Sequence, residues 1–442
     1  MRFFINQKES NNINILDGDI SVAEASSIWG KEDLFKKSSV DLRIFKTPFG
    51  SISLLYGPRQ IGKTSSLKLF LSQLEDSQTI LFTDCSAILN KTDLYQHLFG
   101  LIAGKTTIVL DEVQEVEGWH LALRSLHSEG RLKECRIWCT GSEARYLIES
   151  GERLPGRRGE GKTVFARPWS FREFMDFFHR DETIPYRKIN FQHINQRWLG
   201  EQRVDWSPFW QSYCLTGGVP KAVGTFHKNG NLPDTLWRVY VDWILGSWSK
   251  MRTPERSLSS LARRLCETLN SRVGYESLKK GTDIQSANTI KTLLNIQEDH
   301  FSIRVLPRYD LQRGKFLPSK LKKIYPLDPF MARVFAAIGW NLRRLYDESL
   351  PPLRLDECAF LTQMTRWIDP PEVSYLYSEK SQSEVDFYFE ECGFELKSAG
   401  DPTAKQREIL KLCPHAFVLT KEKIPLMAYL IGEERGQPLA EA

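Results

Sequence analysis

One short segment constrains the fold of this chain more than any other. Residues 57–64, GPRQIGKT, satisfy the pattern G-x-x-x-x-G-K-[ST] directly after the apolar run SISLLY and directly before the helical pattern SSLKLFLSQL. The glycines let the backbone turn tightly, so that successive N–H groups and the helix N-terminus face phosphate oxygens. Lys63 would reach the β- and γ-phosphates, and the Thr64 hydroxyl would bind Mg²⁺. The residues predicted to bind a nucleoside triphosphate are Gly57, Pro58, Arg59, Gln60, Ile61, Gly62, Lys63, Thr64 and Ser65.

A pair of carboxylates supports this site. The apolar run TTIVLD ends in Asp111 and is followed by Glu112. An aspartate at the end of a strand can hold the Mg²⁺ shell, and a neighbouring glutamate can polarise the attacking water. Because a protein that only binds nucleotide would normally lack the second carboxylate, the pair favours hydrolysis.

Two further groups could complete the site, each with a plainer alternative. Thr140 and Ser142 end the run RIWC and would sit where a γ-phosphate sensor lies, although small polar residues also suit an ordinary turn after a strand. Arg157 and Arg158 in LPGRRGEGK could reach the nucleotide of a neighbouring subunit as arginine fingers, or simply form a solvated basic loop.

Strand and helix patterns alternate around these motifs. The β-rich runs cover residues 51–56, 79–84, 106–111 and 136–140, and helical patterns separate them. Near-continuous apolar strands of this kind predict an α/β fold with a parallel sheet covered on both faces. Upstream of them, residues 21–35 have the pattern of a short amphipathic helix.

Composition and cysteine spacing exclude several protein classes. With 41% hydrophobic and 26% charged residues in 442, the chain is typical of ordered globular proteins and long enough for about three domains. Its eight cysteines are scattered without zinc-site or redox spacing, which indicates reduced thiols. Because the longest apolar run is too short for a bilayer and the N-terminus lacks a signal-peptide pattern, we expect a cytoplasmic protein without membrane contacts.

Several motifs together resemble a known family. The series GPRQIGKT, VLDEVQ with Trp119 soon after, CTGS, LPGRR, PWSFREF and LTGGVPKAV is similar to the prokaryotic AAA+ family of archaeal-type P-loop ATPases, over most of the chain. The resemblance implies ATP and Mg²⁺ as ligands, DNA as the suspected substrate, and a ring or dimer assembled through AAA+ interfaces. It also implies that a winged helix and a domain similar to PD-(D/E)xK restriction endonucleases follow the ATPase. The expected domains are an N-terminal extension (1–45), the AAA+ core (46–167), a helical lid (168–250), a winged helix-turn-helix (251–345) and a nuclease-like α/β domain (346–442).

The expected winged helix coincides with the basic part of the chain. Residues 251–330 contain 15 Lys and Arg against 8 Asp and Glu, while the whole chain has a net charge of only +5. A concentrated positive charge suits a phosphate backbone, although it could also be a solvated face. Residues 286–294 resemble a recognition helix, and LQRGK a basic turn. The candidate DNA contacts are Asn288, Lys291 and Thr292 on the helix and Arg304, Arg308, Arg313 and Lys315 on the wing; a protein-docking role for this domain remains the alternative.

Carboxylates near the C-terminus form the second candidate catalytic site. Asp386 lies in an alternating strand, and Glu395 and Lys397 share one face of the next. Two carboxylates and a lysine can hold Mg²⁺, activate water and stabilise the charge that develops when a phosphodiester is cleaved. Glu357 would be a third acidic ligand, and Lys405 and Gln406 open a helix where the nuclease fold often carries an accessory polar residue. The same residues could instead belong to a non-catalytic scaffold or DNA clamp.

These observations favour an ATP-hydrolysing enzyme that acts on DNA and carries a candidate metal-dependent nuclease site. The alternative is a nucleotide-controlled switch that assembles with protein partners and uses its C-terminal domain as a scaffold. A metabolic or kinase-type P-loop protein would leave the additional domains unexplained.

Overall fold

The structure is a computed structural model of the 442-residue chain. It describes residues 4–6, 42–72, 74, 79–143, 154, 156–249, 251, 253–342, 353–365, 373–397 and 400–432. The chain divides into two compact units, residues 1–167 with 299–301 and residues 168–298 with 302–442. The helix expected at residues 21–35 lies outside the described residues. No helix in the described ranges is long and apolar enough to cross a membrane.

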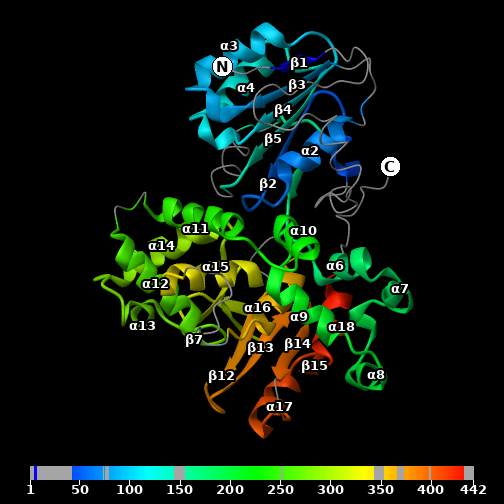
Figure 1. The fold of residues 1–442 in the computed structure, drawn as a ribbon, viewed down its shortest axis with the longest axis vertical. Coiled ribbons are helices and arrows are strands. Elements are labelled where there is room, and N and C mark those ends of the chain that lie inside the picture. Colours follow the sequence, from blue (N-terminus) through cyan, green and yellow to red (C-terminus); the bar gives the residue numbers. More distant parts are fainter. Residues whose placement is uncertain are drawn as a thin grey trace. The chain divides into compact units, whose positions relative to one another are not determined.

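The first unit is built on a six-stranded sheet in the order β1-β3-β4-β5-β2-β6. Five strands are parallel, and β1 joins one edge antiparallel to β3. The four expected strands are confirmed (Figure 1), and β1 and β6 are additional ones. The strands are β1 (Phe4–Asn6), β2 (Ser51–Tyr56), β3 (Thr79–Asp84), β4 (Thr106–Asp111), β5 (Cys135–Gly141) and β6 (Thr163–Phe165). Every residue of β2 and β4 is buried, as expected for central strands of a sheet covered on both faces.

Helices α2 (Lys63–Ser72), α3 (Lys91–Leu101) and α4 (Trp119–Ser128) connect these strands. Helix α2 packs its apolar residues Leu67 and Phe70 into a buried cluster with Leu55 of β2 and Trp138 of β5. The Trp138 indole N–H donates to the Phe45 carbonyl at 3.2 Å, so the segment before β2 is tied to this core. The packing fixes the start of α2 against the carboxyl ends of the strands, where the predicted phosphate site lies.

The second unit begins with helices, as expected for residues 168–250. They are α6 (Phe171–Phe178), α7 (Arg180–Thr183), α8 (Gln196–Glu201), α9 (Ser207–Thr216), α10 (Pro220–Asn229) and α11 (Asp234–Ser249). Helix α6 starts at a capping box, in which the Ser170 hydroxyl accepts from the Glu173 N–H and the Glu173 carboxylate accepts from the Ser170 N–H. This explains the motif PWSFREF as the start of a helix.

The elements that follow run helix, strand, helix, helix, strand and strand. They are α12 (Glu255–Glu267), β7 (Arg272–Val273), α13 (Tyr275–Lys279), α14 (Ala287–Asp299), β8 (Ile303–Leu306) and β11 (Lys322–Pro326). The strands form a three-stranded antiparallel sheet in the order β7-β11-β8. Helix α15 (Pro329–Trp340) packs against α12.

The residues between β8 and β11 correct the expectation of a free basic wing. They form a hairpin of β9 (Arg308–Asp310) and β10 (Lys315–Leu317), and β9 pairs in parallel with β12 (Ser374–Ser378). The hairpin is therefore the edge of a second six-stranded sheet, in the order β10-β9-β12-β13-β14-β15 (Figure 1). The expected boundary at residue 345 does not separate two sheets, because residues 308–317 belong to the C-terminal one.

The remaining elements complete that C-terminal sheet. They are α16 (Asp356–Met364), β13 (Ser383–Phe389), β14 (Cys392–Lys397), α17 (Ala404–Leu410), β15 (His415–Thr420) and α18 (Ile424–Ile431). Strands β12, β13 and β14 are antiparallel neighbours, and β15 runs parallel to β14. Phenylalanine rings join α16 to the sheet: Phe360 of α16 contacts Phe387 and Phe394, and Phe394 stacks on Phe417. All eight cysteines of the chain are free.

The motif LTGGVPKAV is explained by a close approach within the second unit. A Cβ on Gly217 would lie 2.3 Å from the Asp328 carboxylate, and one on Gly218 would lie 2.0 Å from the Trp169 carbonyl oxygen. Asp328 caps α15 by accepting from the Met331 N–H at 2.9 Å and also accepts from the Gly218 N–H at 3.0 Å. One buried carboxylate thus joins the glycine turn to the start of α15.

This buried carboxylate predicts a pH dependence of stability. Burial raises the pKa of Asp328 from 3.8 to about 6, although its backbone hydrogen bonds oppose the shift. Because the folded state favours the protonated form, the free energy of unfolding should fall by up to about 3 kcal/mol as pH rises from about 4 to 6. We expect the difference in unfolding free energy between the native protein and Asp328→Asn, measured by denaturant titration from pH 4.5 to 7.5, to decrease as pH rises. A pH-independent difference would contradict the assignment.

Candidate functional site

The loop between β2 and α2 holds the Lys63 side chain inside it. Lys63 is only 4% exposed, and its ammonium donates to the carbonyl oxygens of Gly57 at 2.9 Å and Pro58 at 2.8 Å. Burial lowers the pKa of Lys63, and the nearby carboxylates of Glu112 and Asp111 oppose this shift. In the described part of the chain the direct partners of the ammonium are carbonyl oxygens, and the charged oxygens of a phosphate would bind it more strongly.

Backbone conformation explains why the loop needs its glycines. Gly62 has a φ of +91°, in the range that L side chains rarely adopt. Gly57 passes so close to Ala166 that a Cβ would lie 2.3 Å from the Ala166 carbonyl oxygen. Gln60 also has a positive φ of 60°. The loop thus keeps a fixed concave shape in which N–H groups can turn toward an anion.

Asp111 connects three parts of this site. Its carboxylate accepts from the Thr64 hydroxyl at 2.9 and 3.1 Å and from the Thr140 hydroxyl at 2.5 Å. Burial raises the pKa of Asp111, and the two hydroxyl donors counteract part of that shift. Loop, central strand and neighbouring strand therefore meet at one carboxylate, and the structure brings together three residues that the sequence assigned to the nucleotide site: Thr64, Asp111 and Thr140.

Glu112 is held in position by its neighbours. Its backbone has a φ of +50°, and its N–H donates to the Thr140 hydroxyl at 2.9 Å. One carboxylate oxygen, Oε2, accepts from the Ser142 hydroxyl at 3.1 Å and from the Gln114 side-chain amide at 2.5 Å. Gln114, which also donates to Ser142 at 3.3 Å, is a site residue that the sequence analysis missed. Its position two residues after the acidic pair was the available signal.

The structure gives Arg158 a different role from the expected arginine finger. Its guanidinium donates to the carbonyl oxygens of Ile52 and Lys162 at 3.2 and 2.9 Å and to the Thr163 hydroxyl at 2.8 Å. These bonds fasten the loop before β6 to β2, so the side chain is fixed on its own sheet and is not extended toward a neighbouring subunit. Arg157 is half-buried in the same loop.

Residues 299–301 add an unexpected contact to the first unit. The Phe301 ring lies 4.8 Å from that of Phe165 and 5.7 Å from that of Tyr56, which ends β2. His300 lies 3.8 Å from Glu143, the residue after Ser142. No sequence pattern near residue 300 indicated this placement.

The second candidate site is an acidic cluster on the C-terminal sheet. Asp386 on β13 and Glu357 on α16 lie near each other, as predicted, and Lys323 of β11 lies between them. The Lys323 ammonium is 2.9 Å from Asp386, 3.3 Å from Glu384 and 3.4 Å from Glu357. The Tyr325 hydroxyl donates to Glu357 at 2.5 Å. Neither Lys323 nor Tyr325 was predicted from the sequence to be part of this site.

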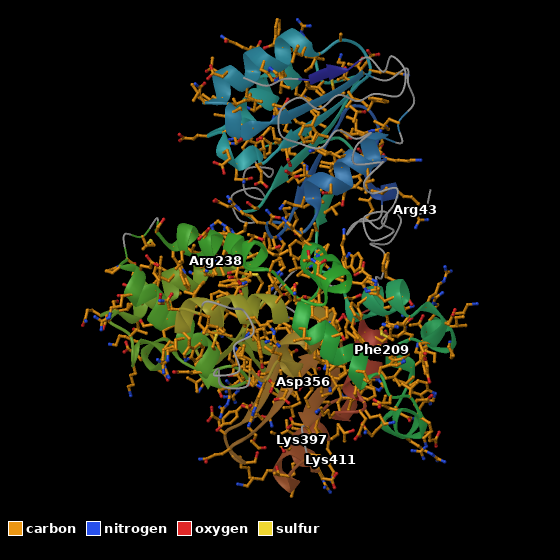
Figure 2. The ribbon with its side chains drawn as sticks, viewed as in Figure 1. Arg43, Phe209, Arg238, Asp356, Lys397 and Lys411 are labelled. Carbon is orange, nitrogen blue, oxygen red and sulfur yellow. The ribbon has the colours of Figure 1, made fainter. Side chains whose placement is uncertain are left out.

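Glu395 and Lys397 lie together on β14, also as predicted. The Lys397 ammonium is 2.8 Å from Glu395 Oε1 and donates to the Gln406 side-chain carbonyl at 3.0 Å. The Gln406 amide donates back to Glu395 Oε1 at 2.5 Å, whereas Glu395 Oε2 is buried without a hydrogen-bond partner. Figure 2 labels Lys397 beside the C-terminal sheet. Among the described residues, Lys405 makes no hydrogen bond or ion pair with this group, and its role stays a prediction.

Burial and mutual repulsion change the acidity of these groups. Burial and the charge of Asp386 raise the pKa of Glu357 to about 8 and that of Glu395 to about 7. Burial also disfavours the charge of Lys323, but Tyr325 and the three surrounding carboxylates outweigh it and raise the pKa of Lys323. In the part of the chain that the structure describes, no group of three or more His, Cys, Asp or Glu residues is arranged to hold a metal ion.

The candidate DNA-contact residues fall into two groups. Asn288, Lys291 and Thr292 are exposed on α14, as predicted, while Ile290 and Leu293 of the same helix are buried. The other four candidates lie on β8 and on the β9–β10 hairpin. Because this hairpin pairs with the C-terminal sheet, it is not the free wing that was expected.

Their individual environments differ. Arg304 is only 4% exposed and so cannot lie along a DNA backbone. Arg308 is 2.5 Å from Glu379 and lies over the Tyr377 ring. Arg313 and Lys315 are exposed on the β9–β10 hairpin.

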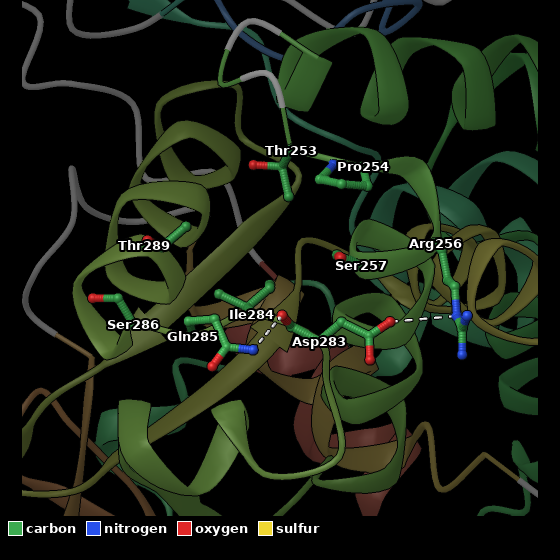
Figure 3. A pocket seen from close by; sticks show the side chains of 9 residues that line it. All are labelled: Thr253, Pro254, Arg256, Ser257, Asp283, Ile284, Gln285, Ser286 and Thr289. Carbon is green, nitrogen blue, oxygen red and sulfur yellow. Dashed lines mark hydrogen bonds and ion pairs between the residues drawn. The ribbon is translucent and has the colours of Figure 1, made fainter.

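A hollow of about 450 Å³ opens beside α14 (Figure 3). Hydroxyl and amide side chains line much of it, and the Arg256–Asp283 ion pair, at 3.3 Å, crosses one side. The lining residues are Thr253, Pro254, Arg256, Ser257, Asp283, Ile284, Gln285, Ser286 and Thr289. Since both partners of the ion pair are largely exposed, the hollow is part of the open surface around the helix.

Comparison with known proteins supports the assignment of the first site. Residues 50–175 match the model of a family described as an AAA domain. Together with the parallel sheet, this match supports a nucleotide-binding P-loop ATPase of the AAA+ type in the first unit. No curated protein matches the chain.

The comparison with solved structures finds, among others, three proteins with TM-scores between 0.32 and 0.41. A Walker-type ATPase of Pyrococcus abyssi is 16% identical, with 69% of this chain and 95% of that chain covered and a TM-score of 0.41. The ORC2 protein of Aeropyrum pernix, solved as ADPNP–ADP complexes, is 10% identical, with 66% and 88% covered and a TM-score of 0.37. The Thermotoga maritima RuvB Holliday junction branch migration motor is 14% identical, with 63% and 90% covered and a TM-score of 0.32. A likeness at this level does not extend to function.

The Thr140 hydroxyl offers a test of the site geometry. Thr140→Val keeps the shape of the side chain but removes the donor to Asp111 and the acceptor of the Glu112 N–H. Because the Asp111 carboxylate and the Glu112 backbone each lose a positioning contact, we expect ATP turnover to fall roughly 10- to 100-fold, with a smaller effect on nucleotide affinity.

Thr107→Val on the same strand as Asp111 is the matched control. Among the described residues the buried Thr107 hydroxyl has no hydrogen-bond partner, so its removal should leave turnover unchanged. Equal turnover in the two variants would show that the Thr140 contacts do not position the carboxylates.

Proposed function

We propose that this protein is a Mg²⁺-dependent ATPase that acts on DNA. The observation that carries the ATPase part is the shared carboxylate of Asp111, which accepts from both Thr64 and Thr140 while Glu112 follows it on the same strand end. The match of residues 50–175 to an AAA domain supports the same conclusion.

The residues present fit a nucleotide-bound Mg²⁺. The Thr64 hydroxyl and the Asp111 carboxylate are adjacent oxygen donors at the N-terminus of α2, and oxygen donors are what Mg²⁺ prefers. When bound there, Mg²⁺ would neutralise charge on the β- and γ-phosphates. Lys63 would exchange its carbonyl partners for phosphate oxygens, and the N–H groups at the start of α2 would face the same anion.

The protein supplies the proton acceptor through Glu112. Its Oε2 is fixed by Ser142 and Gln114, which orients the carboxylate, and Oε1 would take a proton from the water that attacks the γ-phosphate. Thr140 links the backbone of Glu112 to the Asp111 carboxylate, because its hydroxyl donates to Asp111 and accepts from the Glu112 N–H.

The proposal that the protein acts on DNA rests on the second unit. The elements from α12 to β11 follow the order of a winged helix, and α14 exposes Asn288, Lys291 and Thr292, side chains able to contact phosphates or base edges. The positive charge of residues 251–330 lies in the same part of the sequence. Self-association through AAA+ interfaces and a cytoplasmic location complete this proposal.

A nuclease-like fold is supported by the order α16, β12, β13, β14, α17, β15 and by the gathering of Glu357, Asp386, Glu395 and Lys397. One observation favours the alternative, in which the C-terminal domain is a scaffold of a nucleotide-controlled switch. Lys323 is in contact with two of the predicted metal ligands, so the carboxylates as arranged do not fit a divalent ion. Cleavage assays on duplex, single-stranded and branched DNA with Mg²⁺ or Mn²⁺, with and without ATP, would separate the two: loss of cleavage in Asp386→Ala would support the nuclease.

Two substitutions test the ATPase site. Lys63→Ala removes the buried ammonium and should abolish nucleotide binding or turnover. Glu112→Gln keeps the shape but not the proton acceptor, so ATP binding should persist while turnover falls by about a hundredfold or more. Both are measured by phosphate release and by nucleotide titration. Normal turnover in either variant would reject the role given to that residue.

Lys291→Ala tests the DNA-contact face. If Lys291 pairs with a phosphate, the variant should bind duplex DNA more weakly at low salt, and the dependence of log affinity on log salt should become shallower by about one unit. Lys221→Ala, an exposed lysine on α10, is the control and should leave both quantities unchanged. Salt-independent binding by the native protein would argue instead for the protein-docking alternative.

A further inference from the structure

We propose that Lys323 is a built-in cation that takes the place of a divalent metal ion in the acidic cluster of the C-terminal sheet. The inference goes beyond the proposed function, because it concerns the second unit alone and requires neither ATP nor DNA. It predicts that the resting protein binds no metal at this cluster, and that a metal site appears when the Lys323 charge is removed.

The Lys323 ammonium lies where a metal ion would have to lie, among the carboxylates of the cluster. The Lys323 side chain is 0% exposed and lies within 3.4 Å of three carboxylates that come from two elements, α16 and β13. These include Glu357 and Asp386, two of the three ligands that a metal ion would need here. A cation that touches both leaves no room for a second one between them.

Each of the three contacted carboxylates also has a second donor besides Lys323. Asp386 Oδ2 accepts from the Leu396 N–H at 2.9 Å, and Glu384 Oε2 is 2.6 Å from the Arg272 guanidinium. Tyr325 and Lys323 share the same oxygen of Glu357. Asp386 and Glu384 therefore each contact two donors, one on each oxygen. Glu357 contacts two donors through one oxygen. Every carboxylate that Lys323 contacts thus belongs to a connected network of donors and acceptors.

Strand β11 holds Lys323 in a fixed position. Lys323 and Tyr325 alternate with Ile324, so period-two spacing places both polar side chains on one face, and both reach Glu357. Strand β11 is itself fixed between β7 and β8, with Lys323 opposite Arg272 and Leu306. The ammonium is thus supplied by a rigid strand of the three-stranded sheet and not by a mobile surface side chain.

Glu395 indicates that the cluster could still bind a cation. It is 2% exposed, and its Oε2 is the one carboxylate oxygen of this group that is buried without a partner among the described residues. A buried oxygen of this kind calls for a cation or donor. Lys323 has no direct contact with Glu395, so this oxygen lacks a partner even in the native protein. Removal of Lys323 would take its cation from Glu357 and Asp386 as well, and the three carboxylates would then offer oxygens to a metal ion.

The test is Mn²⁺ binding to the full-length, nucleotide-free chain, measured by the loss of the free-ion signal in electron paramagnetic resonance. The native protein and Asp386→Asn should titrate alike. Lys323→Met, which keeps the length of the side chain without its charge, should gain one bound Mn²⁺ per chain. The double variant Lys323→Met with Asp386→Asn should lose that gain, and Lys322→Met, the neighbour on β11, should behave like the native protein.

Two outcomes would overturn the proposal. If the native protein binds one Mn²⁺ that Asp386→Asn abolishes, a metal displaces Lys323 and the site is a true metal centre. If folded Lys323→Met gains no Mn²⁺, Lys323 does not occupy a metal position. Should Lys323→Met fail to fold, judged by circular dichroism, the comparison of native protein with Asp386→Asn still decides. ATP turnover, measured on the same samples, reports separately on the proposed function.

Discussion

The hydrogen bonds to the Asp111 carboxylate are the constraint on which the first unit depends. Thr64 and Thr140 are 47 and 29 residues away in the sequence, yet both donate to it. A buried carboxylate without donors would be costly, so the strands must keep a register that brings both hydroxyls to this point. The parallel pairing of β4 with β5 and of β2 with β5 provides that register. The same contacts place Glu112, the next residue, at the carboxyl end of the sheet, beside the loop.

Two buried lysines in this protein illustrate how surroundings decide what a charge can do. Lys63 is bonded to carbonyl oxygens, which are dipoles without net charge, and burial lowers its pKa. It can exchange these partners for a phosphate at little cost. Lys323 faces carboxylates, which raise its pKa in spite of burial. Removing one partner from such a group leaves an uncompensated buried charge, so the arrangement is fixed.

The sequence predicted local features well and long-range ones poorly. The phosphate loop, the four strands and the acidic pair were recognisable because each depends on a few neighbouring residues. Lys323 was missed because its partners Glu357 and Asp386 lie 34 and 63 residues away, and nothing in KKIYP shows which lysine turns inward. Arg158 and Arg304 look like any other arginine in the sequence, and only the folded chain shows that neither is free to act as predicted. Gln114 was missed for the same reason, because its partner Ser142 follows a different strand and lies 28 residues away.

The β9–β10 hairpin has a consequence for how this chain can be divided. Because β9 pairs with β12, a cut near residue 345 would remove two strands from one sheet and leave both fragments with unpaired backbone edges. Fragments made at that point are expected to aggregate.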